Sequence, residues 1–319
     1  MKITFISKPD EAQFIPSVVR HIAQTHETKE VYTYDMDIIV EAITWADIIW
    51  LEWADPLNIK LTQEYSHLFK NKKVLMRVHS YESVCGYILN INWKAVDHVI
   101  FVAKYIGDLT FSQIANNKIE VNPNLRLWHI PNGIEIQKYP FEKREGDHFN
   151  LAWVGSIFPK KGPMLMIHAM EALVKRDPRY KLFIAGQFND MRDAIYVDHM
   201  IGEMGLKDNI EYTGYQNNIA EWYKDKSFIT CFSEFESQNL SLMEGMLTGM
   251  VPSIHNFPGA KNIYPDELIW TTIDEFVEGI CSIYPGPISD KYRNFVVDNY
   301  SHDLMMKKID ILLSQVIGE

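Results

Sequence analysis

The sequence has few cysteines, no excess of basic residues and no long apolar run, and each shortage excludes a class of protein. The three cysteines, Cys85, Cys231 and Cys281, lie too far apart for a metal-ligand spacing, and a disulfide framework is not expected. The formal net charge of −11 gives no overall basic footprint for nucleic acid. The chain has neither a run of about 18 apolar residues nor a signal-peptide pattern. We therefore expect a cytoplasmic protein whose membrane contact is at most peripheral.

The composition, 47% hydrophobic and 23% charged over 319 residues, is typical of a globular protein with two domains. Short apolar runs alternate with longer amphipathic stretches, which predicts parallel sheets wrapped by helices. A turn at Pro131–Glu135 and a polar, aperiodic segment at Phe141–His148 interrupt this alternation. We predict an α/β protein with two Rossmann-like, doubly wound domains, residues 1–145 and 146–290, followed by helical residues 291–319.

The expected elements follow the alternation through both domains. Strands are expected at Lys2–Ile6, Glu30–Tyr34, Asp47–Leu51, Lys73–Val78, His98–Val102, Asn150–Val154, Lys181–Ala185, Ile210–Thr213, Ser227–Cys231 and Val251–His255. Helices are expected at Glu11–Gln24 with a break at Pro16, Ile38–Trp45, Thr62–Phe69, Pro163–Lys175, Ala194–Met204, Ile219–Tyr223 and, in two pieces, Lys291–Val316. Ligands of such sheets bind beyond the carboxyl ends of the strands, so the site is expected on the loops that follow strands.

The first such loop is V-G-S-I-F-P-K-K-G-P, at Val154–Pro163. Gly155 directly follows a strand, Gly162 precedes a helix, and Lys161 lies next to the helix start. Backbone N–H groups at a helix start favour an anion, and a lysine adds a full positive charge. The loop is either an anion site or a solvated turn with two surface lysines, because it lacks the Walker A pattern.

The second loop lies within S-E-F-E-S-Q-N-L-S-L-M-E-G-M-L-T-G-M-V-P, at Ser233–Pro252. A helix is expected to begin at Asn239 or Leu240 and to end at Gly249, a residue type common at helix C-termini. The N–H groups of Gln238, Asn239 and Leu240 would then point out of the helix start.

Two glutamates of this stretch have different explanations. Glu236 lies at the helix start, where a carboxylate offsets the helix dipole without any ligand. Glu244 lies within the helix among apolar neighbours, and its side chain leans back toward the helix N-terminus. A carboxylate in such surroundings needs a partner. The vicinal hydroxyls of a ribose are suitable donors.

The first domain offers a separate group of candidates. His79 directly follows a predicted strand in R-V-H-S-Y-E, and it is either a functional residue or a structural histidine. Glu52, Trp53 and Tyr81 also lie at predicted strand ends. Because aromatic rings stack on sugar faces, these three residues are a possible acceptor site. The alternative is a pair of core tryptophans, Trp50 and Trp53, beside a surface acid.

Taken in order, these motifs resemble those of the retaining GT-B glycosyltransferases of family GT4, the glycosyl transferases group 1. The resemblance is clearest over Asn150–Trp270. The family's V-G-R-x-x-x-x-K-G pattern is matched from Val154 to Gly162, and its two glutamates with seven residues between them are matched by Glu236 and Glu244. The stretches L-F-I-A-G, G-L-K-D-N-I-E-Y-T-G, E-G-M-L-T-G-M-V-P-S-I and P-N-G-I-E also resemble family motifs.

The resemblance implies a fold and a reaction. Two domains would face a cleft, and the C-terminal helix would cross back to the first domain. The donor would be a nucleotide-diphosphate sugar, UDP- or GDP-linked, and the acceptor a glycan, a lipid-linked glycan or a small molecule. Transfer would retain the anomeric configuration and would need neither a metal nor a cofactor.

The resemblance also implies roles for individual residues. Lys161 would neutralise the donor diphosphate, and Glu244 would hold the ribose hydroxyls. Glu236 would lie beside the donor sugar, and His79 would lie near the transferred sugar. The remaining donor-binding positions implied by the match are Gly155, Ser156, Gln238, Asn239 and Leu240.

One departure from the family pattern bears on the activity. Ser156 stands where the family has an arginine, which removes one positive charge from the diphosphate site. Lys8, Arg77 and Lys160 are the candidates to replace it. Because of Ser156, a GT-B protein that binds a nucleotide or a glycan without catalysis is the alternative hypothesis. An epimerase or phosphorylase of the same fold is a third hypothesis, which fits fewer of the motifs.

Overall fold

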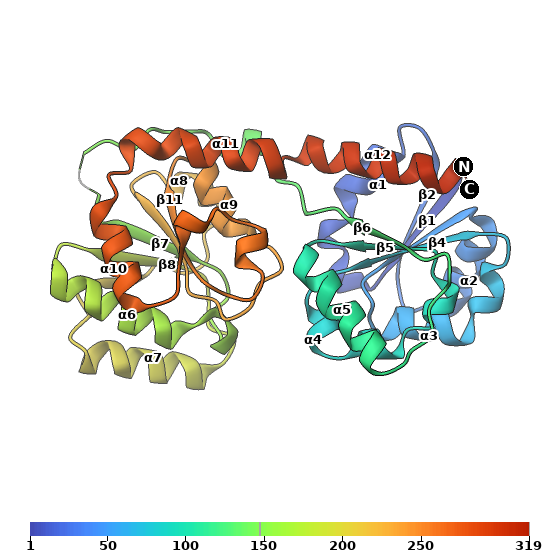
Figure 1. Ribbon diagram of the computed structural model, residues 1–319, viewed down its shortest axis with the longest axis horizontal. Coiled ribbons are helices and arrows are strands. Elements are labelled where there is room, and N and C mark those ends of the chain that lie inside the picture. Colours follow the sequence, from blue (N-terminus) through green and yellow to red (C-terminus); the bar gives the residue numbers. More distant parts are fainter. Residues whose placement is uncertain (147, 319) are drawn as a thin grey trace. The chain divides into compact units, whose positions relative to one another are not determined.

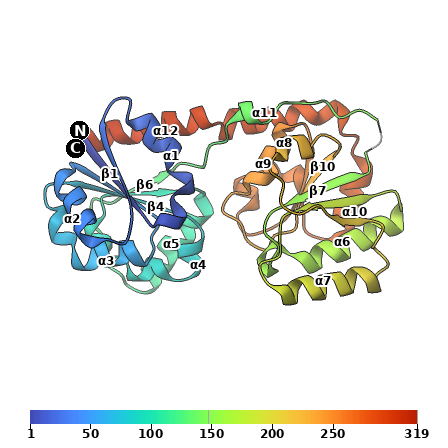
Figure 2. The same cartoon turned by 180° about the vertical axis from the view of Figure 1, so that it is seen from behind.

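The computed structural model describes residues 1–146 and 148–318, with the backbone alone for residues 11–13, and it divides the chain into two compact units (Figures 1 and 2). Unit 1 comprises Met1–Gly133 and Asp303–Glu319, and unit 2 comprises Ile134–His302. Each unit has a six-stranded sheet in which all paired strands are parallel. The predicted fold class, an α/β protein with two Rossmann-like domains, is confirmed.

The sheet of unit 1 has the strand order β2-β1-β3-β4-β5-β6. Its strands are β1 (Lys2–Ser7), β2 (Glu27–Tyr32), β3 (Ile48–Glu52), β4 (Lys73–Val78), β5 (His98–Phe101) and β6 (Arg126–His129). The central strands β1, β3 and β4 are buried on both faces, which explains their continuous apolar runs.

Helices cover both faces of this sheet. They are α1 (Pro16–Ile22), α2 (Met36–Trp45), α3 (Pro56–Glu64), α4 (Tyr81–Val84), α5 (Lys104–Asn116) and α12 (His302–Gly318). One face carries α1 and α12 (Figure 1). The apolar side chains of these two helices form a single core with those of the central strands. The C-terminal helix therefore packs on unit 1, as the resemblance implied. Among residues 1–146 and 148–318, none of the helices combines the length and apolar character that a membrane span needs.

The sheet of unit 2 has the strand order β12-β11-β10-β7-β8-β9. Its strands are β7 (Asn150–Val154), β8 (Lys181–Ala185), β9 (Ile210–Tyr212), β10 (Phe228–Cys231), β11 (Val251–His255) and β12 (Ile269–Trp270). The helices are α6 (Pro163–Arg176), α7 (Met191–Glu203), α8 (Ile219–Trp222), α9 (Leu240–Leu247), α10 (Ile273–Ser282) and α11 (Ser289–Tyr300). In both views α6 and α7 lie on one face of the sheet, and α8, α9 and α11 lie on the other (Figures 1 and 2).

Several helices differ from the sequence-based expectation. The expected helix Thr62–Phe69 contains the end of α3 and a separate 3₁₀ helix, Ser66–Phe69. Helix α3 begins earlier because Asp55 accepts a hydrogen bond from the N–H of Asn58 and Pro56 occupies the first helical position. Pro16 does break the first expected helix, since a 3₁₀ helix ends at Phe14 and α1 begins at Pro16. Helices α5 and α10 were not predicted.

The division into units also differs from the predicted domain limits. Residues 134–146 belong to unit 2, whereas the sequence placed the first 12 of them in the first domain. Ile134 is part of the unit 2 core, and the buried Arg144 donates hydrogen bonds to the carbonyl oxygens of Lys224 and Thr248. Helix α11 likewise belongs to unit 2, so only α12 of the predicted C-terminal pair belongs to unit 1.

A glycine allows two loops of unit 2 to touch. Gly162, just before α6, has a φ of 69°, and a Cβ atom added there would lie 2.1 Å from the carbonyl oxygen of Phe232. Phe232 directly follows β10. The loop after β7 can therefore approach the loop after β10 this closely only with glycine at position 162.

We expect Gly162→Ala to destabilise unit 2 more than Gly205→Ala does. Gly205 has a similar φ of +70°, but a Cβ atom there would meet no atom within 4 Å. Gly205→Ala should therefore lower the free energy of unfolding by only about 1–2 kcal/mol, the cost of placing a residue with a Cβ atom in the left-handed conformation. Gly162→Ala should add roughly 1–3 kcal/mol of overpacking. Urea denaturation of the two variants measures the difference, and equal losses would contradict the close approach.

Candidate active site

The predicted binding loops of unit 2 meet at one point of its sheet. Strands β7 and β10 are neighbours, while β8 and β9 lie beyond β7, and β11 and β12 lie beyond β10. The strand order therefore reverses between β7 and β10, and ligands of open α/β sheets bind at such a switch point, beyond the carboxyl ends of the strands. The loops that follow these two strands are residues 155–162 and 232–239, which the sequence singled out.

An ion pair joins the two loops. The Lys161 Nζ lies 2.5 Å from the Glu236 Oε1, and the Ser233 hydroxyl donates to the same oxygen over 2.8 Å. The N–H of Glu234 donates to the carbonyl oxygen of Lys160 over 2.9 Å. Glu236 is buried, and Lys161 is largely so. The structure thus brings together two residues that the sequence had proposed as catalytic.

The helix that follows this pair begins where the sequence placed it. Helix α9 begins at Leu240, and the Oδ1 of Asn239 accepts a hydrogen bond from the N–H of Leu242. It ends at Leu247, and Gly249 follows with a φ of 97°. The Asn239 side chain is engaged in capping its own helix. The group through which this residue could bind an anion is therefore its backbone N–H.

A pocket of about 370 Å³ lies beside this helix. Gly155 and Ser156 from the first loop line it together with Glu244 from α9, so three predicted donor-binding residues share one cavity. Further lining residues come from the loops after β8 and β9. They include Gln187 and the exposed Tyr215.

Glu244 is half-buried in the wall of this pocket. Burial raises the pKa of its carboxyl, and a hydrogen bond with the hydroxyl of Tyr139 acts in the opposite direction. The expectation that this carboxylate needs a partner is therefore met in part by Tyr139. Sequence reasoning missed Tyr139, which lies before the first strand of unit 2 in no recognisable motif. It also missed Tyr215, whose position shortly after β9 was the available signal.

The candidates of unit 1 form a buried polar network. His79 directly follows β4, as predicted, and its Nε2 lies 3.0 Å from the Glu52 Oε1. The Arg77 guanidinium donates to the same oxygen over 3.3 Å, and the Trp50 Nε1 donates to the Oε2 over 2.9 Å. Burial acts to raise the pKa of Glu52, but the charge of Arg77 and the hydrogen bond of His79 outweigh it, and the pKa is lowered. Arg77 also donates to the side chain of Asn132.

This network corrects one expectation about an acceptor site. Glu52 is 1% exposed and holds His79 and Arg77, so it is not a surface acid. The Trp53 ring stacks on the His79 ring with 3.8 Å between the ring centroids. Tyr81 is 56% exposed and contacts Tyr87 edge-on, at a ring distance of 5.8 Å. The structure therefore groups Trp53 with His79, and it shows Tyr81 against a different aromatic neighbour.

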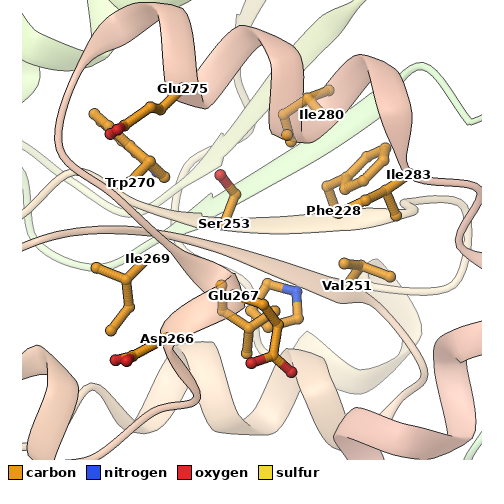
Figure 3. A pocket seen from close by; sticks show the side chains of 13 residues that line it. Phe228, Val251, Ser253, Asp266, Glu267, Ile269, Trp270, Glu275, Ile280 and Ile283 are labelled. Carbon is orange, nitrogen blue, oxygen red and sulfur yellow. The ribbon is translucent and has the colours of Figure 1, made fainter.

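A second pocket in unit 2, of about 260 Å³, is lined by residues of β10, β11, β12 and α10 (Figure 3). Phe228 and Val251, the first residues of β10 and β11, line it. Two of its acidic residues have structural partners. Glu267 pairs with Lys291, and Glu275 belongs to the capping box of α10. Its lining residues differ from those of the loops after β7 and β10, where the predicted site lies.

Residues 135–274, which include both loops and the Glu244 pocket, match the family profile described as Glycosyl transferases group 1. Over this region the chain is similar to the glycosyl transferases group 1 family. The family resemblance seen in the sequence is confirmed for unit 2. Within the described ranges, no three His, Cys, Asp or Glu side chains are grouped as ligands for a metal.

Curated relatives match part of the chain. The GDP-mannose:cellobiosyl-diphosphopolyprenol alpha-mannosyltransferase of Xanthomonas oryzae pv. oryzae is 25% identical over 173 residues, 54% of this chain and 43% of that protein. The D-inositol 3-phosphate glycosyltransferase of Frankia alni is 30% identical over 116 residues, 33% of this chain and 28% of that protein. The match thus spans less than half the length of either relative.

Solved structures resemble the whole chain. Anabaena Alr3699/HepE, in complex with UDP and glucose, has a TM-score of 0.77 at 14% identity, covering 99% of this chain and 100% of that one. Sucrose-phosphate synthase from Thermosynechococcus elongatus has a TM-score of 0.75 at 13% identity, covering 100% and 99%. At these identities the likeness establishes the fold, which is that of the GT-B glycosyltransferases.

We expect Glu52→Gln to destabilise unit 1 by about 3–5 kcal/mol at neutral pH, because it leaves the buried Arg77 charge without its carboxylate. The pKa of Glu52 is lowered in the folded protein, so its stabilising contribution is complete above the unfolded pKa of about 4.3. The contribution is lost as the pH falls through the lower, folded pKa. Urea denaturation of the unmodified chain and of Glu52→Gln, at several pH values from neutral to acid, measures their free energies of unfolding. The difference between the two should become smaller as the pH falls.

Glu41→Gln is the matched control for this variant. Glu41 is 76% exposed and pairs with Lys29 on the surface, so its loss should cost less than about 1 kcal/mol. A Glu52→Gln protein as stable as the Glu41→Gln protein would contradict the role of the buried network.

Proposed function

We propose that this chain is a glycosyltransferase that transfers a sugar from a UDP- or GDP-linked donor to a glycan-type acceptor, with retention of configuration and without a metal or cofactor. The main support is the switch point of unit 2. There the Lys161–Glu236 pair and the pocket lined by Glu244 occupy loops of the region that is similar to the group 1 family.

The donor roles follow from the chemistry of these groups. Lys161 and the N–H groups of 238–240 stabilise the diphosphate as negative charge develops on the leaving nucleotide. Glu244 accepts hydrogen bonds from the ribose hydroxyls, which replaces the water lost through its burial. Gly155 and Ser156 line the same pocket, and the exposed ring of Tyr215 offers a stacking surface for the base.

The relatives guide the choice of substrates. One curated relative is named for GDP-mannose and a diphosphopolyprenol-linked glycan, and a solved structural relative is described with UDP and glucose. We therefore propose a nucleotide-diphosphate hexose as donor and a glycan, lipid-linked or small-molecule acceptor. In unit 1, His79 is proposed to lie near the transferred sugar, and Trp53, stacked on His79, is the better supported acceptor contact.

The test is a transfer assay of the full chain with a panel of UDP- and GDP-hexoses and glycan acceptors. We expect Lys161→Ala to lower kcat by roughly 10²–10³, the effect of removing one electrostatic stabiliser of a leaving group. Glu244→Ala should weaken binding of the donor by roughly 10- to 100-fold, since hydrogen bonds to a charged group are lost. NMR of the product reports the anomeric configuration, and EDTA treatment tests for a metal requirement.

Lys175→Ala is the control for these variants, because Lys175 pairs with Glu171 on the exposed face of α6. Donor binding without transfer or hydrolysis under every acceptor would instead favour the binding-protein hypothesis, which Ser156 motivates. Unchanged kinetics in both Lys161→Ala and Glu244→Ala would contradict the assigned roles.

Donor affinity should also depend on pH through Glu244. Its pKa is raised by burial in the free protein, and two hydroxyl donors stabilise the charged carboxylate in the complex. Affinity should therefore fall as the pH drops through the raised pKa, and binding near that pH should release protons. Calorimetry with an intact sugar nucleotide in buffers of different ionisation enthalpy measures this release, which Glu244→Gln should abolish.

A further inference from the structure

Two of the three candidates to replace the family arginine already have partners in unit 1. The Lys8 ammonium lies 3.5 Å from the Asp55 carboxylate. The Arg77 guanidinium is buried against Glu52 and Asn132. Removing either cation from its partner would leave a buried carboxylate uncompensated, so neither is available to a ligand at low cost.

Lys160 differs from both. It precedes Lys161 in the loop after β7, and no carboxylate within the described ranges lies within 4 Å of its ammonium group. The charges of Glu236 and Lys161 both act on this ammonium group. The two loops carry two lysines, Lys160 and Lys161, and two glutamates, of which Glu234 is exposed and Glu236 already pairs with Lys161 at 2.5 Å. Of these two lysines, Lys160 is therefore the one with no carboxylate against its ammonium group among the described residues.

The surroundings of Lys160 make this charge costly in the absence of an anion. The side chain is half-buried, and burial lowers the pKa of its ammonium group. The Glu236 carboxylate opposes this lowering of the pKa, and the charge of Lys161 adds to it. A phosphate oxygen near Lys160 would supply the missing counter-charge.

The backbone of Lys160 is held in place. Its carbonyl oxygen accepts a hydrogen bond from the N–H of Glu234, and the next two residues are fixed by the Lys161–Glu236 pair and the close approach of Gly162 to Phe232. Lys160 therefore extends from a rigid segment, and little backbone ordering is needed when an anion binds. Ser156, in contrast, is exposed and carries no charge.

We propose that Lys160 supplies the second positive charge for the donor diphosphate, in place of an arginine at position 156. This inference rests on the proposed function. It makes Lys160 a residue specific to the diphosphate, while Glu244 and its pocket bind the nucleoside. The preference for a nucleoside diphosphate over the monophosphate should thus depend on Lys160.

Calorimetry with UDP, UMP, GDP and GMP tests this division of roles in the full chain. Lys160→Met should weaken binding of the preferred diphosphate by roughly 10- to 100-fold, the loss expected for a charge-assisted hydrogen bond. Binding of the matching monophosphate should change much less. Lys160→Gln, which keeps a polar head, should behave in the same way, and Lys160→Arg should retain most of the affinity.

A second arm restores the charge from the family position. Adding Ser156→Arg to Lys160→Met should recover part of the lost diphosphate affinity, which a merely structural role of Lys160 does not predict. Lys175→Met removes a lysine charge elsewhere in unit 2 and should leave both affinities unchanged.

The outcomes separate the inference from the proposed function. If the unmodified chain binds a nucleoside diphosphate and Lys160→Met binds it equally well, the inference is overturned and the proposed function stands. Equal losses of diphosphate and monophosphate binding would also overturn it. If the unmodified chain binds neither UDP nor GDP, the proposed function fails and the role of Lys160 fails with it.

Discussion

The close approach of Gly162 to the carbonyl oxygen of Phe232 holds the two loops of the candidate site together. The hydrogen bond between Glu234 and Lys160 and the Lys161–Glu236 ion pair both form across the same junction. Since the loops follow neighbouring strands at the switch point, the sheet sets their distance and glycine removes the last steric obstacle. The Lys161–Glu236 pair thus depends on a close backbone approach that leaves no room for a side chain at position 162.

The ion pair at this junction also shapes what a ligand must do. The Ser233 hydroxyl and Lys161 both bind the same oxygen of Glu236, so this buried carboxylate is held from two sides. An incoming diphosphate cannot take Lys161 away without leaving Glu236 under-compensated. A ligand that adds its oxygens to Lys161 while Glu236 stays in place avoids that cost, and it then needs a cation outside the pair. This requirement is the physical reason for assigning importance to Lys160.

The sequence predicted the parts of this structure that depend on local patterns. Apolar runs marked the buried parallel strands, and the helix expected from Asn239 or Leu240 to Gly249 corresponds to α9. The meeting of Lys161 and Glu236, 75 residues apart, was accessible because both follow strands of one sheet and match family motifs. Tyr139 was not accessible, because its contact with Glu244 depends on how residues 134–146 pack on unit 2. The burial of Glu52 was also missed, because it depends on contacts between strands. The partners of Glu52 are Arg77, on the neighbouring strand β4, and His79, directly after that strand.

The network around Glu52 limits what His79 can offer a substrate. The lowered pKa of Glu52 means that its carboxylate is ionised, and an ionised carboxylate only accepts hydrogen bonds. The Nε2 of His79, 3.0 Å away, must therefore carry a proton. The Arg77 guanidinium, 3.3 Å from the same carboxylate, supplies it with a positive charge. The Nε2 of His79 is therefore engaged by Glu52, and stacking on Trp53 fixes the plane of the ring. The contact with a sugar that we propose for His79 would thus be made through the Nδ1 side of the ring rather than through Nε2.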